Sequence, residues 1–283
     1  MMPETVLSGL AFPEGPRWHD GALYFSDMHA GIVWRLTPDG AATQVTTVLN
    51  SPSGLGWFPD GTLAIVSMLD RRLLRLEPDA TAVAIADLST LTRFPINDML
   101  VIGSRAYIGS FGFDLMKGEK PRSAALFCVE QNGRIRTVAE DLLFPNGMVV
   151  TPDGKTLVVA ETYGARLTAF DLQPDGSLTN RRIFAQLERV SPDGICLDAE
   201  GSIWVACANG NKIIRVKEDG EITDTVPLPG RHSYACMLGG ADRRDLYVCT
   251  AHDFRPERTL QERAGKIEVM RVQVPGAPEA SVQ

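Results

Sequence analysis

The hydrophobic positions of the chain fall into short runs of roughly four to eight residues, rich in valine, isoleucine, leucine and aromatic residues. Glycine, proline, aspartate and asparagine separate these runs, and tripeptides such as Pro-Asp-Gly mark turns between them. The sequence has no long segment with the 3.6-residue apolar period of an amphipathic helix. The pattern predicts an all-β protein.

One unit of this pattern recurs along the chain. Residues 144–172 and 191–216 align without a gap for most of their length, so that Gly147 matches Gly194. Six units spaced about 40 to 50 residues apart have the period of four-stranded blades, which predicts a six-bladed β-propeller. The four units that follow the frame less tightly lie at 12–27, 51–67, 94–110 and 232–250.

We expect the whole chain, residues 1–283, to form this single propeller domain. The early strand at 4–9 is expected to pair with the last blade, because a closed ring leaves no sheet edge exposed. The segment 275–283 is expected to fray, as chain ends do when nothing holds them. A closed ring needs no partner to cover its edges, so we expect a monomer or a weak homodimer.

Composition and charge further restrict the class of protein and its possible partners. Hydrophobic residues at 44% and charged residues at 22% are typical of a globular protein with a sizeable core. The formal charge of −7 argues against nucleic acid and anionic membranes as partners, and no apolar run is long enough for a membrane span. The N-terminal residues lack the pattern of a signal peptide. Five cysteines without CxxC spacing predict free core thiols in a cytoplasmic protein.

The Pro-Asp-Gly at 192–194 differs from the other copies, because Asp193 does not lie at the turn of its unit. That turn is at Glu200-Gly201, and Asp193 stands where the innermost strand begins, beside the predicted central channel. Four of the six residues in this position carry hard oxygen donors, and pseudo-symmetry directs them at a common axis. The six residues are Glu14, Ser53, Asn97, Asn146, Asp193 and Tyr234.

These six residues, called the slot residues below, predict a metal site. Two carboxylates and two amides that face one another in a narrow channel would repel and lack partners. One divalent cation would resolve both problems, and oxygen ligands favour Ca²⁺ first, with Mn²⁺, Mg²⁺ or Zn²⁺ as alternatives. The competing interpretation is that the residues only cap strand ends beside channel water.

The segments "FPEGPRW", "FPNGM" and "SPDGICLD" resemble the signatures of the gluconolactonase, regucalcin and luciferin-regenerating-enzyme-like family. This resemblance extends over the whole chain and implies a six-bladed propeller with one divalent metal in its channel. It also implies that Glu14, Asn146 and Asp193 are the metal ligands. Asn97 would contact the substrate or a metal-bound water, with Asp98 beside it.

One departure from the family pattern concerns substrate recognition. Family members that act on sugar lactones often carry an arginine two residues before the position of Asn97, where this chain has Pro95. Arg93, two places further back, is the candidate substitute, and an ordinary exposed arginine at a loop end is the alternative. The departure puts recognition of sugar acids in doubt.

Two long loops are expected to lie at the metal face, at 111–123 and 251–265. Long loops in compact domains are often functional, and an apolar wall is typical of a small-molecule site. Phe111 and Phe113 of the first loop are therefore candidate substrate contacts. The alternative is that both rings pack their loop onto the blade.

The interpretation we favour is a metal-dependent hydrolase that opens a sugar lactone or another small lactone with metal-activated water. Asp193 would accept the proton of the attacking water, and Asp98 is a second candidate for a catalytic role. One alternative is calcium-dependent hydrolysis of organophosphate or aryl esters, which needs the same cation and carboxylate. Another is a non-catalytic, calcium-binding propeller that senses a ligand.

Overall fold

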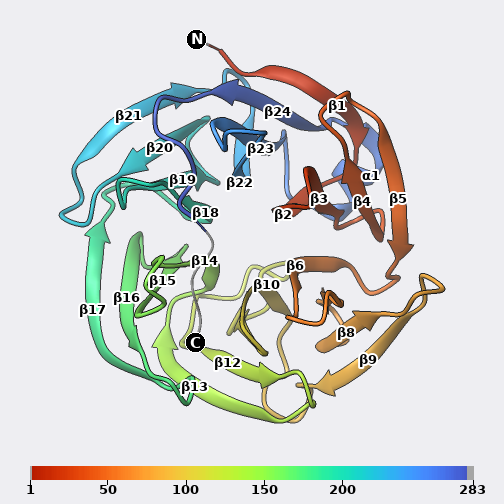
Figure 1. Ribbon diagram of the computed structural model, residues 1–283, viewed down its shortest axis with the longest axis vertical. Coiled ribbons are helices and arrows are strands. Elements are labelled where there is room, and N and C mark those ends of the chain that lie inside the picture. The colour runs from red at the N-terminus through yellow and green to blue at the C-terminus, as the bar shows by residue number, and fades with distance from the viewer. Residues whose placement is uncertain (1, 279–283) are drawn as a thin grey trace.

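The computed structural model describes residues 2–278 as six four-stranded antiparallel sheets arranged around a central channel (Figure 1). Each sheet is one blade, and its strands follow one another from the channel to the rim. The arrangement confirms the predicted six-bladed β-propeller. Within residues 2–278, no helix is long and apolar enough to cross a membrane.

Five blades are built from consecutive strands, and the sixth takes in the first strand of the chain. Blades 1 and 2 contain β2 (Pro13–His19), β3 (Ala22–Asp27), β4 (Ile32–Leu36), β5 (Ala42–Thr47), β6 (Pro52–Trp57), β7 (Leu63–Ser67), β8 (Arg72–Leu76) and β9 (Ala82–Asp87). Blades 3 and 4 contain β10 (Ile96–Ile102), β11 (Arg105–Ser110), β12 (Ala124–Glu130), β13 (Ile135–Leu142), β14 (Pro145–Val150), β15 (Thr156–Glu161), β16 (Arg166–Leu172) and β17 (Leu178–Gln186). Blades 5 and 6 contain β18 (Pro192–Leu197), β19 (Ile203–Cys207), β20 (Lys212–Val216), β21 (Ile222–Pro227), β22 (His232–Gly239), β23 (Asp245–Ala251), β24 (Gly265–Arg271) and β1 (Glu4–Leu10).

The ring is closed by β1, which pairs antiparallel with β24 as the outermost strand of blade 6. The register joins Thr5 to Glu268 and Leu10 to Gly265. The edge of the last blade is thus covered by the beginning of the chain, as expected for the strand at 4–9.

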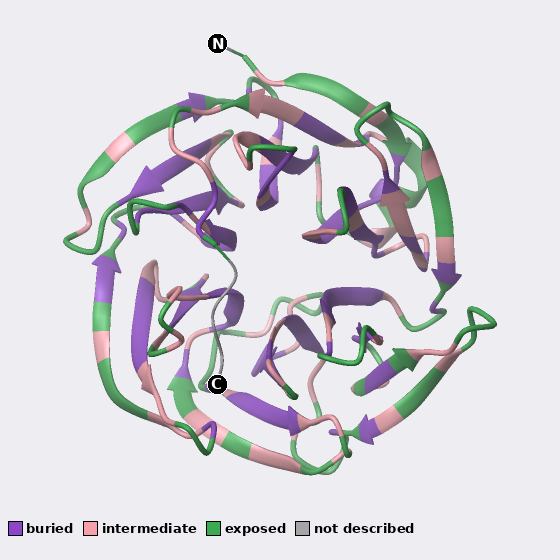
Figure 2. Ribbon diagram, in the orientation of Figure 1, coloured by how far each residue is buried: buried purple, intermediate pink, exposed green. Residues whose placement is uncertain are grey.

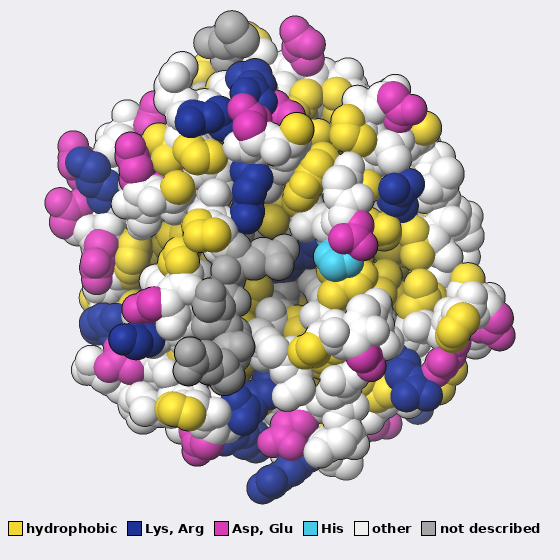
Figure 3. Space-filling model, viewed as in Figure 1, with side chains coloured by type: hydrophobic (Ala, Val, Ile, Leu, Met, Phe, Trp, Pro, Cys, Tyr) yellow, Lys and Arg dark blue, Asp and Glu magenta, His cyan; other side chains and the backbone are white. Residues whose placement is uncertain are grey.

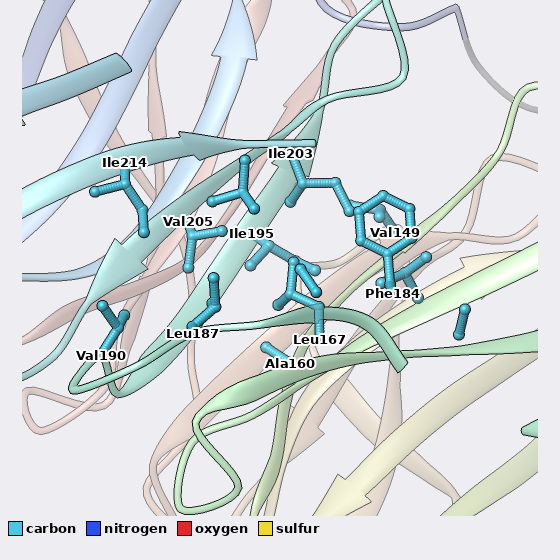
Figure 4. Close-up of a cluster of buried hydrophobic side chains, with 14 of the residues drawn as sticks. Val149, Ala160, Leu167, Phe184, Leu187, Val190, Ile195, Ile203, Val205 and Ile214 are labelled. Atoms are coloured by element: carbon cyan, nitrogen blue, oxygen red, sulfur yellow. The ribbon is translucent and has the colours of Figure 1, made fainter. Parts of the chain in front are cut away.

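The hydrophobic core lies between neighbouring blades. The inner strands are mostly buried, whereas the outer strands are mostly exposed or partly buried (Figure 2). Between blades 4 and 5, Val149 and Leu167 pack with Ile195, Val205 and Ile214 (Figure 4). This burial of apolar side chains holds the blades in their positions around the channel.

A glycine follows the slot residue in four of the six inner strands, where neighbouring blades approach most closely. A Cβ atom on Gly194 would lie 2.6 Å from the Cα of Ala235, and one on Gly147 would lie 2.5 Å from the backbone nitrogen of Ile195. Pro-Asp-Gly at 192–194 is therefore not a hairpin turn. The turn of that blade has Gly201, with a φ of 79°.

The expectation that 275–283 frays is wrong for its described part, residues 275–278. The backbone nitrogen of Ala199 donates to the carbonyl of Pro275 at 2.8 Å, and that of Ala277 donates to the carbonyl of Leu197 at 3.0 Å. These bonds dock the segment onto the end of β18, and Ala277 is only 7% exposed. Residues 279–283 lie outside the described residues.

Replacement of Gly194 by alanine is predicted to destabilise the propeller by about 1–3 kcal/mol, because the added methyl group overpacks the contact between blades 5 and 6. Urea unfolding followed by tryptophan fluorescence would measure the loss. Gly210→Ala is the matched control, since its Cβ would meet only side-chain atoms, at 3.3 Å and beyond. Equal stability of the two variants would contradict the close-approach argument.

Candidate metal centre

The six slot residues lie at the start of the six inner strands and are all buried. Their exposed fractions range from 2% for Ser53 to 8% for Glu14. Neighbouring slot residues meet, since the Ser53 Oγ lies 3.4 Å from the Asn97 Oδ1. The structure thus brings the predicted residues together at one mouth of the channel, called the slot mouth below.

The electrostatics of the slot mouth are dominated by buried carboxyl groups. Burial, and then the nearby Asp98, raises the pKa of Glu14 to about 8. Burial likewise raises the pKa of Asp193 well above its usual range, and the charges of Glu14 and Asp98 raise it further, while a hydrogen bond from Asn146 partly offsets the rise. The negative groups therefore lie close enough to oppose one another's ionisation.

Asp193 has a buried carboxylate oxygen without a partner in the described part of the chain, which indicates that a positive group would bind there. Its Oδ1 atom is buried and has no hydrogen-bond partner among residues 2–278. Buried carboxylate oxygens are costly to leave unpaired. The Glu14 Oε2 accepts the backbone N–H of Gly15 at 2.8 Å, which leaves its other oxygen for the channel.

The donor set suits a hard cation. Within residues 2–278 there is no group of three or more His, Cys, Asp and Glu side chains placed to hold a metal ion. A site here would therefore draw on a donor outside these four residue types, and Asn146 is the slot amide that lies beside Asp193. Two carboxylates and an amide oxygen match the preference of calcium, magnesium and manganese for oxygen ligands.

Thr162 fixes the amide of Asn146, and the sequence analysis did not find this residue. The Asn146 Nδ2 donates to the Thr162 Oγ1 at 3.2 Å, and that hydroxyl donates to the carbonyl of Pro192 at 2.8 Å. Because its proton is committed to Pro192, the hydroxyl accepts the amide N–H₂ group and leaves the Asn146 Oδ1 for another partner. Thr162 directly follows the second strand of its unit, where the loops around the slot begin, and this position could have identified it from the sequence.

Asp98 is buried beside the slot residues and is held by an ion pair. Its Oδ1 accepts from the Arg17 Nη2 at 3.1 Å and from the backbone nitrogen of Met99 at 2.7 Å. Arg17 also donates to the carbonyl of Met99. Asp98 therefore acts on Glu14 and Asp193 through its charge, while its own position is fixed.

Arg93 is not brought to the slot mouth in this structure. It is exposed, and its guanidinium lies 4.7 Å from the centre of the Phe94 ring. It lines a separate groove that also includes Ser110 and Glu140. In the described part of the chain, no hydrogen bond or ion pair joins Arg93 to a slot residue.

Phe111 and Phe113 belong to a ring of apolar side chains at the slot mouth, called the apolar rim below. Phe111 packs on Phe144 with 4.4 Å between ring centres, and Phe113, only 1% exposed, packs on Phe144 and Tyr163. Both rings do hold their loop, and the same cluster includes the slot residue Tyr234. The rim consists of Phe12, Met28, Met68, Phe111, Phe113, Phe144, Tyr234 and Ala251.

The second long loop contains a short helix that the sequence pattern did not predict, α1 (Pro256–Glu262). Its Thr259 lies 2.7 Å from the His29 Nδ1, and His29 stacks on Phe12 with 4.7 Å between ring centres. Burial lowers the pKa of His29 to about 4. The loop at 251–265 is thereby joined to the apolar rim.

The opposite mouth of the channel contains a cavity. A cavity of about 520 Å³ lies there, lined mainly by apolar side chains from the far ends of the inner strands together with Arg17, Arg243 and the segment 276–278. Figure 3 shows hydrophobic side chains around a central hollow. This cavity, called the second mouth below, contains none of the slot residues.

The fold and the slot define a class: a six-bladed propeller whose channel carries buried oxygen donors at one mouth. The sequence model of the SMP-30/gluconolactonase/LRE-like region matches residues 12–252, and the chain belongs to this family.

Two curated relatives are similar over nearly the full chain. Regucalcin from Pongo abelii is 34% identical, over 93% of this chain and 89% of that protein. A 6-deoxy-6-sulfogluconolactonase from Pseudomonas putida is 27% identical, over 94% of this chain and 93% of that protein.

Solved structures show the same fold. A luciferin-regenerating enzyme superposes with a TM-score of 0.84 at 21% identity, covering 100% of this chain and 99% of that one. A calcium-binding regucalcin from Agrobacterium tumefaciens gives 0.82 at 22% identity, covering 99% and 97%.

The raised pKa of Glu14 predicts how the stability of cation-free protein depends on pH. The folded state keeps a proton up to about pH 8, which the unfolded chain releases near 4.5. The contribution of Glu14 to the free energy of unfolding is therefore fully present below pH 4.5, and it is lost as the pH rises through 8. The free energy of unfolding should fall between pH 6.5 and 8, by at most about 1.4 kcal/mol per pH unit for one group.

Urea unfolding of chelator-treated protein would measure this slope. Glu14→Gln should make it shallower, because the amide does not titrate and only the contribution of Asp193 remains. Glu218→Gln, at an exposed glutamate, is the control and should leave the slope as in the wild type. A slope that is the same in all three proteins would show that Glu14 ionises normally.

Proposed function

We propose that the protein is a cation-dependent lactone hydrolase whose reaction centre is the slot mouth. The observation that carries the proposal is the buried pair Glu14 and Asp193, with one Asp193 oxygen lacking any partner among the described residues. The name of the Pseudomonas putida relative, a sulfogluconolactonase, supports the substrate class. The calcium-binding regucalcin of the same fold supports a divalent cation.

Glu14, Asn146 and Asp193 would hold the cation, with Ca²⁺ first and Mn²⁺, Mg²⁺ or Zn²⁺ as alternatives. When bound, such an ion polarises an ester carbonyl and lowers the pKa of water. It would also satisfy the Asp193 Oδ1 and offset the burial and the nearby Asp98 charge that raise the pKa of Glu14. Calcium fits best because it accepts amide oxygens and irregular geometry.

Asp193 is proposed as the general base. Its carboxylate takes the proton from a water that attacks the lactone carbonyl, and the proton then passes to the ring oxygen as the C–O bond breaks. Asn97 would orient the ester by hydrogen bonding. Asp98, held by Arg17, contributes its negative charge, which favours the positive partner that the slot requires.

The surroundings of the slot favour an uncharged lactone. Phe111, Phe144 and the rest of the apolar rim offer an apolar wall and exclude water. Pro95 stands where family members acting on sugar lactones often carry an arginine, and Arg93 lies over Phe94 instead. A substrate with an anionic group would therefore lack a guanidinium partner there.

The cellular setting proposed is the cytoplasm, and the proposed assembly is a monomer or a weak homodimer. All five cysteines are free and buried, which fits a reducing compartment. Closure of the ring by β1 and β24 removes the need for a partner at that edge.

The proposal predicts that chelator-stripped protein regains lactone hydrolysis when a divalent cation is added. A pH-stat assay of γ- and δ-lactones, with Ca²⁺, Mn²⁺, Mg²⁺ or Zn²⁺ added in turn, would measure this. The Asp193→Asn variant should lose about 10²–10⁴-fold in turnover, because the general base is removed. Asp175→Asn, at an exposed turn, is the matched control and should keep the wild-type rate.

Other outcomes of the same assay would point elsewhere. Hydrolysis of organophosphate or aryl esters without lactone turnover would show that these esters, and not lactones, are the substrate class. Stoichiometric cation binding without turnover of any ester would favour a non-catalytic propeller that senses a ligand. An Asp193→Asn variant with the wild-type rate would remove Asp193 from the role of base.

Thr162 is predicted to set cation affinity without taking part in the reaction. Thr162→Val removes the hydroxyl that holds the Asn146 amide, and should weaken Ca²⁺ binding by about 10–100-fold. Isothermal titration calorimetry, or the rise in melting temperature with added Ca²⁺, would measure this. Thr162→Ser keeps the hydroxyl and should bind as the wild type does. Equal affinity of the valine variant would show that Asn146 needs no such support.

A further inference from the structure

Two cysteine sulfurs meet in the hydrophobic core between blades 5 and 6. The Sγ atoms of Cys196 and Cys236 lie 3.7 Å apart. Cys196 belongs to β18 of blade 5 and Cys236 to β22 of blade 6, so the contact crosses the boundary between two blades. Both thiols are free.

The two strands approach each other closely beside this contact. A Cβ on Gly194 would lie 2.6 Å from the Cα of Ala235, so the two strands touch one residue before Cys236. A disulfide needs an S–S distance of about 2.05 Å, and the two sulfurs would have to approach by roughly 1.7 Å. Formation of the bridge would require side-chain rotation with a small shift of either strand.

The two sulfurs differ in their access. Cys196 lines the cavity of the second mouth, about 520 Å³ in volume, whereas Cys236 does not. Cys236 is 1% exposed, and burial raises the pKa of its thiol well above the usual range. A small oxidant that enters the second mouth therefore meets the Cys196 sulfur first.

We propose that Cys196 and Cys236 form a reversible dithiol–disulfide site that hydroperoxides reach through the second mouth. The Cys196 sulfur gives up its proton and displaces one oxygen of hydrogen peroxide, which yields a sulfenic acid and one water. The Cys236 sulfur then displaces the hydroxyl group, which leaves as a second water. The two thiols lose two electrons and two protons, and the peroxide is reduced to two waters.

The bridge would join blade 5 to blade 6 directly behind the slot mouth. Asp193 precedes Cys196 by three residues in β18, and Tyr234 precedes Cys236 by two in β22. Oxidation should raise the melting temperature of cation-free protein, because the bridge restricts the unfolded chain. The inference requires neither a cation nor the proposed lactonase activity.

The test is peptide mapping of wild-type protein treated with hydrogen peroxide, alkylated and digested without reductant. We expect a Cys196–Cys236 cross-linked peptide, an intact mass lower by two hydrogens, and loss of both signals on addition of dithiothreitol. In Cys196→Ala the cross-link should fall by at least about tenfold, since one partner is absent. Cys207→Ala, another buried cysteine of blade 5, is the matched control and should keep it.

Peptide mapping of the wild-type protein tests the Cys196–Cys236 bridge even if a variant folds poorly. Cys196 found as a sulfinic acid with Cys236 unmodified would overturn the proposal, because the second sulfur would have failed to capture the first product. So would five cysteines that stay reduced, or a cross-link between any other pair.

Discussion

Six inner strands converge on one axis, and this convergence is the constraint on which the rest of the structure depends. Where they come closest, a methyl group on Gly147 or Gly194 would collide with the backbone of the next blade. The glycine therefore follows the slot residue for a packing reason. The same convergence presses the preceding side chains, among them Glu14 and Asp193, into a small buried volume.

That burial has an electrostatic cost that the described chain does not offset by itself. Burial raises the pKa of both Glu14 and Asp193, neighbouring carboxylates raise each pKa further, and the Asp193 Oδ1 finds no donor among residues 2–278. Elsewhere the protein handles buried acids differently. Glu161, fully buried, is paired with Arg166 and Thr168, and its pKa is lowered. The contrast supports the proposal that the slot mouth is a functional site, because this fold can satisfy a carboxylate where structure alone is at stake.

The sequence predicted the features that recur in each unit, and it did not predict the features that occur only once. Pseudo-symmetry of the six units was enough to predict the blades and the residues that share the slot. Thr162, helix α1 and the docking of Pro275 and Ala277 occur once each, so no internal comparison could reveal them. The position of Arg93 depends on its stacking with Phe94, which is likewise local to one loop.

Asp98 breaks the pattern of glycines after the slot residues and changes the charge at the slot mouth. It stands where four other blades have glycine, and so adds a third carboxylate to Glu14 and Asp193. The chain offsets one of the three with the partly buried Arg17, 3.1 Å from Asp98. When all four groups are ionised, three negative charges and one positive charge leave a net charge of −2. A divalent cation neutralises this charge, whereas a monovalent ion leaves one buried charge uncompensated, so the ion pair on the far side of Asp98 favours an ion of charge +2 at the slot mouth.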